Sequence, residues 1–191
     1  MSLEDALLII DMQNDFVLPS SPFHIKGATA TLPNIVRVRS QFRKQRRPIF
    51  HVVREYRADG ADIERFRLAE FERVGGYAVP GTAGCRIVDE LTPLDGEYRI
   101  VKNRFSAFMN TELDFMLRGL RVCGLTVVGT QYPNCIRATV FDAVALGYSV
   151  TVVTDATSAM SDEIARANIV DLRNVGVRCL TTGEFLDSLE G

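Results

Sequence analysis

The chain of 191 residues contains no tryptophan, only two histidines and only four cysteines. The two histidines, His24 and His51, leave little material for a His-rich metal site or for a choice of histidine bases. The four cysteines form no Cys-x-x-Cys pair, which disfavours zinc ribbons and dense disulfide scaffolds and favours a reducing, cytoplasmic compartment. They stand at positions 85, 123, 135 and 179.

Long apolar runs and an excess of one charge are also missing. The longest early apolar run, residues 6–10, is closed by Asp5 and Asp11, so it is too short for a signal peptide or a membrane span. With 22 basic and 24 acidic residues the net charge is -2, and we expect neither nucleic acid nor membrane as a partner. Residues 37–47 hold five arginines and one lysine. Aromatic residues do not alternate with them and no RNA-binding motif accompanies them, so a solvated helix face or a subunit contact is favoured over a nucleic-acid patch.

An apolar fraction of 47% supplies an ample core for a single domain over residues 1–191. Apolar segments typical of buried strands alternate with helical segments, which predicts an α/β fold with a parallel sheet and helices on both faces. The irregular residues 54–97 are expected to cross the substrate side. We predict strands over residues 6–10, 49–53, 98–101, 126–128, 150–153 and 175–180, and helices over 33–47, 61–71, 110–120, 136–146, 162–173 and 184–189.

An acid, a base and a thiol follow predicted strands of this sheet. Asp11 follows the first strand, Lys102 the third, and Cys135 lies in the turn after the fourth, where ligands of parallel sheets bind. The helix expected after Cys135 favours a thiolate and offers free backbone N–H groups to an oxyanion. Each residue also has a plain structural interpretation: a buried filler for Cys135, a turn or cap for Asp11 or Asp15, and a solvent-seeking charge for Lys102. The sequence has neither G-x-G-x-x-G nor G-x-x-x-x-G-K-[ST], so nucleotide binding has little support.

Three segments together resemble the isochorismatase-like cysteine hydrolases: residues 8–16 (LIIDMQNDF), 101–108 (VKNRFSAF) and 129–139 (GTQYPNCIRAT), the last followed by Asp142 and Ala143. Their order and spacing agree over nearly the whole chain. The resemblance implies a three-layer α/β/α fold with a six-stranded, mostly parallel, doubly wound Rossmann-like sheet. It also implies a catalytic triad of Asp11, Lys102 and Cys135, a cis peptide before Gln131, and an oxyanion hole formed by the backbone N–H groups of Gln131 and Cys135.

The sequence departs from one branch of that family. Nicotinamidases carry an Asp-x-His metal segment after the second strand, whereas residues 51–57 read HVVREYR, so we expect no metal and no cofactor. The isochorismatases proper manage without the cysteine, so Cys135 favours hydrolysis of an amide, carbamoyl or ureido C–N bond through a thioester. Two alternatives stay open: a vinyl-ether hydrolase with Asp11 as the acid, and a non-catalytic binding or scaffold protein of the same fold.

The expected substrate is a small molecule, and six residues are candidates to contact it. Four flank the triad in sequence and two follow the second strand, where they are expected to meet a substrate carboxylate. Core packing is an equally good interpretation for the aromatic ones. The resemblance also implies a homo-oligomer, a dimer or a tetramer. The flanking candidates are Gln13, Phe16, Phe108 and Tyr132, and the carboxylate candidates are Arg54 and Tyr56.

Overall fold

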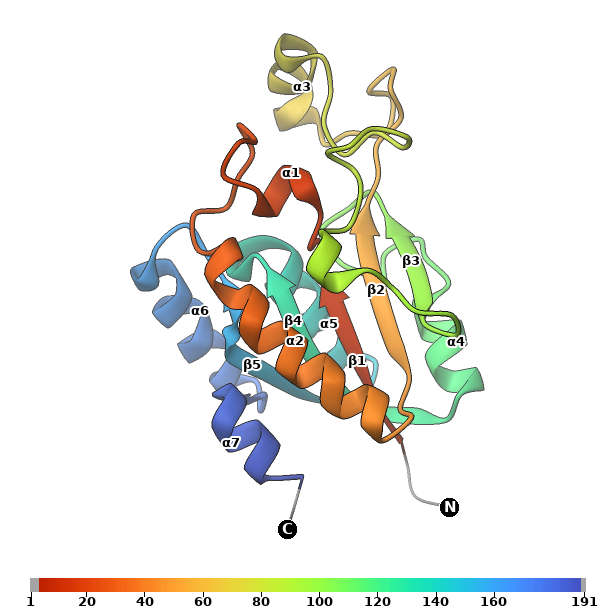
Figure 1. Cartoon of the computed structure of the whole chain (residues 1–191), viewed down its shortest axis with the longest axis vertical. Helices are drawn as coiled ribbons and strands as arrows, with labels where there is room; N and C mark the ends of the chain where they lie inside the picture. Colours follow the sequence, from red (N-terminus) through yellow and green to blue (C-terminus); the bar gives the residue numbers. More distant parts are fainter. Residues whose placement is uncertain (1–3, 190–191) are drawn as a thin grey trace.

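The computed structural model describes residues 4–189 and places a six-stranded sheet between two layers of helices (Figure 1). The strands are β1 (Glu4–Ile10), β2 (Ile49–Arg54), β3 (Tyr98–Lys102), β4 (Val122–Thr130), β5 (Ser149–Ser158) and β6 (Arg178–Leu180). The α-helices are α1 (Asn14–Val17), α2 (Ala28–Lys44), α3 (Leu68–Val74), α4 (Leu113–Gly119), α5 (Arg137–Ala145), α6 (Asp162–Asn174) and α7 (Thr182–Asp187). Short 3-10 turns lie at Arg65–Arg67 and Asp89–Leu91, and a π-helical turn at Tyr132–Ile136.

Every strand pair in the sheet is parallel, and the strand order is β3-β2-β1-β4-β5-β6. The chain winds outward in one direction through β2 and β3, then returns to the other side of β1 for β4, β5 and β6. The order therefore reverses between β1 and β4, and a doubly wound sheet binds its ligands beyond the carboxyl ends of the strands at that point. The predicted three-layer α/β/α class is confirmed.

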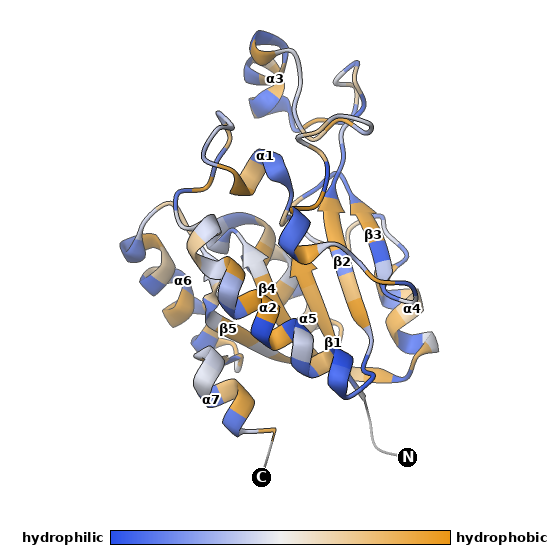
Figure 2. Cartoon of the chain, in the orientation of Figure 1, coloured by the Kyte–Doolittle hydropathy of each residue, from blue (hydrophilic) through white to orange (hydrophobic). Residues whose placement is uncertain are grey.

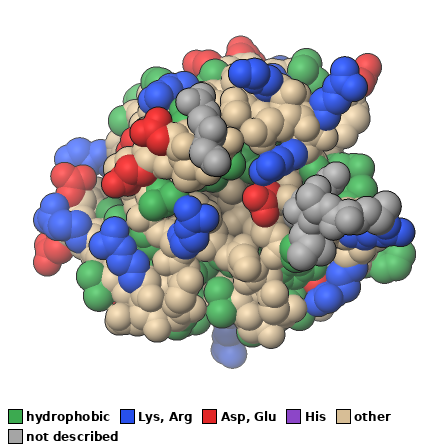
Figure 3. Space-filling view, turned by 90° about the horizontal axis from the view of Figure 1, so that it is seen from below, with side chains coloured by type: hydrophobic (Ala, Val, Ile, Leu, Met, Phe, Trp, Pro, Cys, Tyr) green, Lys and Arg blue, Asp and Glu red, His purple; other side chains and the backbone are tan. Residues whose placement is uncertain are grey.

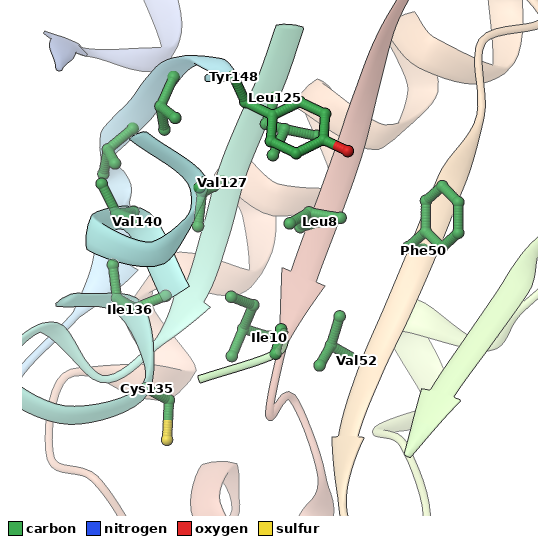
Figure 4. Close-up of a cluster of buried hydrophobic side chains, with 14 of the residues drawn as sticks. Leu8, Ile10, Phe50, Val52, Leu125, Val127, Cys135, Ile136, Val140 and Tyr148 are labelled. Carbon is green, nitrogen blue, oxygen red and sulfur yellow. The ribbon is translucent and has the colours of Figure 1, made fainter. Parts of the chain in front are cut away.

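Alternation along the strands divides the core into two clusters. Leu8 and Ile10 of β1 face a cluster shared with α4, α5 and α6, whereas Leu7 and Ile9 face a cluster shared with α2 and α7. Because helices cover both faces, β1 is apolar at every position from Ala6 to Ile10, as the orange central strands of Figure 2 show. Figure 4 shows the first cluster, with Cys135 at its edge.

Several predicted boundaries differ from the observed ones. Helix α2 begins at Ala28, not at Pro33, so the proline lies in the second turn, where it cannot donate a hydrogen bond to the carbonyl of Thr29. The predicted helix over 61–71 is instead a 3-10 turn followed by α3, which ends where Gly75 adopts a left-handed φ of 76°. Strands β4 and β5 are longer than their apolar cores because pairing with β1 and with each other extends them through polar residues. Strand β6 begins three residues later than predicted.

The excursion after β2 covers the carboxyl ends of the strands. In Figure 1, α1 and α3 with their loops lie beyond the arrowheads of β1 and β2. Gln13 and Ile87 form an antiparallel bridge that ties the α1 segment to the excursion. Side chains of this lid-like layer therefore stand over the place where parallel sheets bind ligands.

The basic segment over residues 37–47 is largely engaged within the chain. Arg43 pairs with Glu97, Arg47 pairs with Asp5, and Arg39 donates to a backbone oxygen. Figure 3 shows the opposite end of the molecule from the strand carboxyl ends, where basic and acidic side chains are interspersed. Among residues 4–189 no helix is long and apolar enough to cross a bilayer.

Candidate active site

Asp11 and Lys102 form a buried ion pair beyond the sheet. Asp11 directly follows β1 with a left-handed φ of 52°, and Lys102 is the last residue of β3. The Nζ of Lys102 donates to Oδ2 of Asp11 at 2.8 Å, and the two side chains are 0% and 4% exposed. The other carboxylate oxygen, Oδ1, is buried and has no hydrogen-bond partner. A buried acceptor without a donor is costly, so this oxygen is well suited to accept a hydrogen bond from a bound group.

Cys135 lies near the Asp11–Lys102 pair and follows β4 in the chain. The strand ends at Thr130, the Thr130–Gln131 peptide is cis as expected, and the π-helical turn that follows carries the cysteine. Gly129 permits the turn because a Cβ at this position would overlap the carbonyl oxygen of Ile10. Figure 4 shows the Cys135 sulfur pointing away from Ile136 and the apolar cluster.

A cavity of about 30 Å³ lies at this point and brings the elements together. The thiol and the Asp11 carboxylate both line it, together with the residues that flank the cis peptide. Its lining comprises Asp11, Phe16, Ile25, Arg54, Arg67, Thr130, Gln131, Asn134 and Cys135. The sequence-predicted acid, base and thiol thus converge, although they come from three different strands.

Arg54 adds a second cation to the site. It is the last residue of β2, its side chain is 1% exposed, and its Nη2 lies 3.2 Å from the Cys135 sulfur. Its Nε lies 4.0 Å from Oδ2 of Asp11. On the other side, Nη1 lies 2.9 Å from Oε1 of Glu64 and also bonds the Tyr56 hydroxyl, which in turn donates to Glu64. The guanidinium is thereby fixed between Glu64 and the thiol.

The environment of the site raises the pKa of Cys135 and lowers the pKa of Glu64. Burial raises the pKa of the Cys135 thiol, the Asp11 carboxylate raises it further, and Lys102 and Arg54 oppose the rise. The helix-terminus argument from the sequence predicted the reverse, a stabilised thiolate, and it is outweighed because the sulfur is cut off from water. For Glu64, burial acts to raise the pKa, but the Tyr56 hydrogen bond and the Arg54 charge outweigh it and lower the pKa. The raised pKa keeps Cys135 as a thiol in the resting site.

Of the six residues predicted to contact the substrate, two line the cavity beside Cys135 and four do not. Phe16 lines the cavity, and so does Arg54. Gln13 is fully buried, and its amide binds the backbone of Arg54 and Cys85. The remaining aromatic residues are placed by packing: Tyr56 binds Glu64, Phe108 stacks on Tyr148 at 5.9 Å, and the Tyr132 hydroxyl donates to the Thr154 oxygen at 3.3 Å. Neither Phe108 nor Tyr132 lines the cavity beside Cys135.

Two charged residues of the site escaped the sequence reasoning. Glu64 and Arg67 lie in the irregular segment after β2, within or beside the 3-10 turn at Arg65–Arg67. The signal that would have found Glu64 is electrostatic: an arginine at the buried end of a strand needs a carboxylate partner. Arg67 lines the cavity with Cys135 and has no comparable partner.

The donor set after β2 does not fit a metal ion. Where an Asp-x-His segment would supply ligands, this chain brings the Arg54 guanidinium and the Tyr56 phenol to the site. A guanidinium has no free electron pair to donate and repels a cation. Between residues 4 and 189, no three His, Cys, Asp or Glu side chains gather in a metal-binding arrangement. His51 lies on β2, where its Nε2 bonds Glu97 at 2.8 Å.

Comparison with known proteins assigns the chain and its fold to a family. Residues 5–184 match the family model described as the Isochorismatase domain. The chain belongs to the isochorismatase family. A solved structure of an isochorismatase family protein from Desulfovibrio vulgaris superposes with a TM-score of 0.95 at 48% identity, covering 100% of both chains.

Relatives in the isochorismatase family carry names that imply different activities. A protein of Arabidopsis thaliana named probable inactive nicotinamidase is 45% identical, and the match covers 96% of this chain and 95% of the relative. An N-carbamoylsarcosine amidase of an Arthrobacter species is 29% identical over 88% of this chain and 65% of its own length. The family generally comprises hydrolases that act on amides.

Proposed function

We propose that the chain is a cysteine hydrolase that cleaves a C–N bond of a small amide, carbamoyl or ureido compound through a thioester. One observation carries the proposal: Cys135 and Asp11 line one small cavity, and Oδ1 of Asp11 is buried without a hydrogen-bond partner. A nucleophile beside a base, with the base held by a third group, is the arrangement that covalent acyl transfer requires. Lys102 is that third group.

In the first half-reaction Asp11 acts as the base. Its Oδ1 takes the thiol proton while the sulfur attacks the substrate carbonyl carbon, and the carbonyl π pair moves to oxygen. Backbone N–H groups of Gln131 and Cys135 are the proposed donors to that oxyanion, each worth about 3 kcal/mol by analogy with other oxyanion holes. The oxygen pair then re-forms the carbonyl, the C–N bond breaks, and Asp11 returns its proton to the leaving nitrogen.

In the second half-reaction water replaces the amine. Asp11 accepts a proton from water as its oxygen bonds the thioester carbon. The C–S bond then breaks, and the sulfur recovers the proton from Asp11. Lys102 and Arg54 contribute charge at both stages, because they hold Asp11 in place and face the sulfur as it becomes anionic. The raised thiol pKa suits this cycle, since the proton leaves only when Asp11 and substrate are both in place.

Replacement of Cys135 tests the proposal. We expect Cys135→Ala to abolish turnover on a panel of N-carbamoyl amino acids, ureas and simple amides, and Cys123→Ala on β4 to serve as the matched control with full turnover. Mass spectrometry of quenched wild-type reactions should show an acyl adduct on the peptide that carries Cys135. Wild-type turnover in Cys135→Ala would remove the nucleophile from the proposal.

The same variants separate the two alternatives. A vinyl-ether hydrolase with Asp11 as the acid predicts activity on vinyl ethers that survives alkylation of Cys135 and is lost in Asp11→Asn. The name of the Arabidopsis relative, a probable inactive nicotinamidase, makes a non-catalytic protein the second alternative. That alternative predicts no turnover on any substrate panel. The similarity to the Arthrobacter amidase favours C–N cleavage over both alternatives. A cytoplasmic location and a dimer or tetramer stay predictions, which fractionation and light scattering would test.

A further inference from the structure

Arg67 stands at the junction of two cavities. It lines the cavity of about 30 Å³ that contains Cys135 and a neighbouring cavity of about 230 Å³. The larger cavity is walled by Phe16, Phe23 and Tyr77, with the Phe23 and Tyr77 rings stacked at 4.0 Å. Four residues line both spaces, so the two adjoin: Phe16, Ile25, Arg67 and Gln131.

Arg67 lacks a salt bridge of its own among the described residues, and Glu64, the carboxylate that acts on it at a distance, is already paired with Arg54. Arg67 forms no salt bridge with any residue from 4 to 189. Its Nη1 lies 3.5 Å from the hydroxyl of Tyr56 and 3.4 Å from that of Tyr77, and the guanidinium stacks over the Phe66 and Phe105 rings at 5.2 Å. Neutral partners of this kind hold a guanidinium in place and leave its charge available.

The carboxylates nearest to Arg67 in sequence are already engaged. Glu64 accepts from Arg54 and Tyr56, and Glu70, which also lines the larger cavity, pairs with Arg73. A half-buried guanidinium with a fixed orientation and no carboxylate partner is suited to bind a planar oxyanion from outside.

We propose that Arg67 binds a carboxylate of the substrate, while the aromatic wall of the larger cavity holds its hydrocarbon part. The inference rests on the proposed function only for the position of the scissile bond, which lies at Cys135. Arg54 and Tyr56, the carboxylate contacts expected from the sequence, are already bound to Glu64. The substrate class is therefore a small amide or ureido compound that carries a carboxylate beyond a short apolar spacer.

Alkylation of Cys135 tests the carboxylate subsite without requiring turnover. The probe is N-iodoacetylglycine, compared with its neutral analogue N-iodoacetylglycinamide; both deliver the same reactive carbon, and only one carries the anion. The measured quantity is the ratio of the two rates at Cys135, read by peptide mapping. We expect Arg67→Met to lower this ratio about tenfold, which corresponds to about 1.4 kcal/mol. Arg65→Met, an exposed arginine of the same turn, should leave it unchanged.

A second variant keeps the test decisive if Arg67→Met folds poorly. Arg67→Lys retains the charge and loses the planar fork, so it should keep a ratio between those of wild type and Arg67→Met. An unchanged ratio in Arg67→Met, or an equal fall in Arg65→Met, would overturn the subsite. Failure of the proposed function looks different: the alkylation ratios would follow these expectations while the amide panel showed no turnover.

Discussion

Glu64→Gln is the sharpest perturbation that the site offers, because it removes one negative charge with little change in shape. Glu64 and the Cys135 sulfur contact different nitrogens of the same Arg54 guanidinium, at 2.9 and 3.2 Å. In the variant the guanidinium keeps its positive charge but loses its carboxylate partner. Its field then acts more fully on the sulfur, and the pKa of Cys135 should fall.

The size of the shift follows from the geometry. Two groups that touch separate nitrogens of one guanidinium lie roughly 7 Å apart, and at an effective dielectric constant of about 20 their charges interact by roughly 2 kcal/mol. That energy lowers the pKa of Cys135 by about 1.5 units, since one unit is worth about 1.4 kcal/mol. Below both pKa values the thiolate fraction rises about thirtyfold, but a less basic thiolate is also less nucleophilic. With a Brønsted coefficient of about 0.5, alkylation should become about fivefold faster.

The assay is the rate of Cys135 alkylation by iodoacetamide as a function of pH, followed by peptide mapping. Glu70→Gln is the matched control: it removes a carboxylate from the same segment, but one that is exposed and paired with Arg73, so its profile should match wild type. Circular dichroism confirms that each variant is folded. An unchanged or raised midpoint in Glu64→Gln would refute the reasoning, because it would mean that Arg54 does not act on the sulfur.

Three further predictions concern stability, measured by chemical denaturation. Lys102→Met removes the close partner of the buried Asp11 carboxylate, leaves it only Arg54 at 4.0 Å, and should cost about 3–5 kcal/mol; an Asp11→Asn, Lys102→Met double variant should recover part of it, and no recovery would argue against the pair. The pKa of Glu97 is lowered to about 2, against burial, by its hydrogen bonds from basic side chains. A lowered pKa stabilises the fold above the ordinary glutamate pKa, so about 2 kcal/mol, after allowance for solvent screening, should be lost as pH falls from about 4.5 toward 2. Glu97→Gln should flatten this pH dependence, and an equally steep one would contradict the assignment. Gly129→Ala should cost at least about 3 kcal/mol, because its φ is 115° and the new Cβ meets the Ile10 carbonyl; a loss below 1 kcal/mol would mean that the turn relaxes freely.

Sequence reasoning located the residues that the sheet itself positions. Asp11 and Lys102 stand at strand ends, and Cys135 lies in the turn after a strand, so an apolar run followed by a chemical group suffices to find them. Glu64 and Arg67 lie in the segment after β2, whose path depends on contacts far along the chain and has no periodicity to read. Their positions needed the three-dimensional structure.

Proximity in sequence was a poor guide to pocket contacts. Gln13, two residues after Asp11, turns inward because backbone groups of Arg54 and Cys85 need its amide. Tyr132, three residues before Cys135, points into the core, since consecutive residues of a tight turn project in different directions. Phe16 lines the cavity, because α1 brings it back over the strand ends.

The charges around the thiol give a consistent account of the site. Asp11 and Glu64 supply two negative charges, and Lys102 and Arg54 supply two positive ones, so this group is neutral while Cys135 is a thiol. Arg67 adds one positive charge that no described residue cancels. A substrate with one carboxylate would neutralise it, and Asp11 is the proposed acceptor of the thiol proton. Under the proposed function, the site would admit an anion first and release the thiol proton only during attack, which would link the choice of substrate to the activation of the nucleophile.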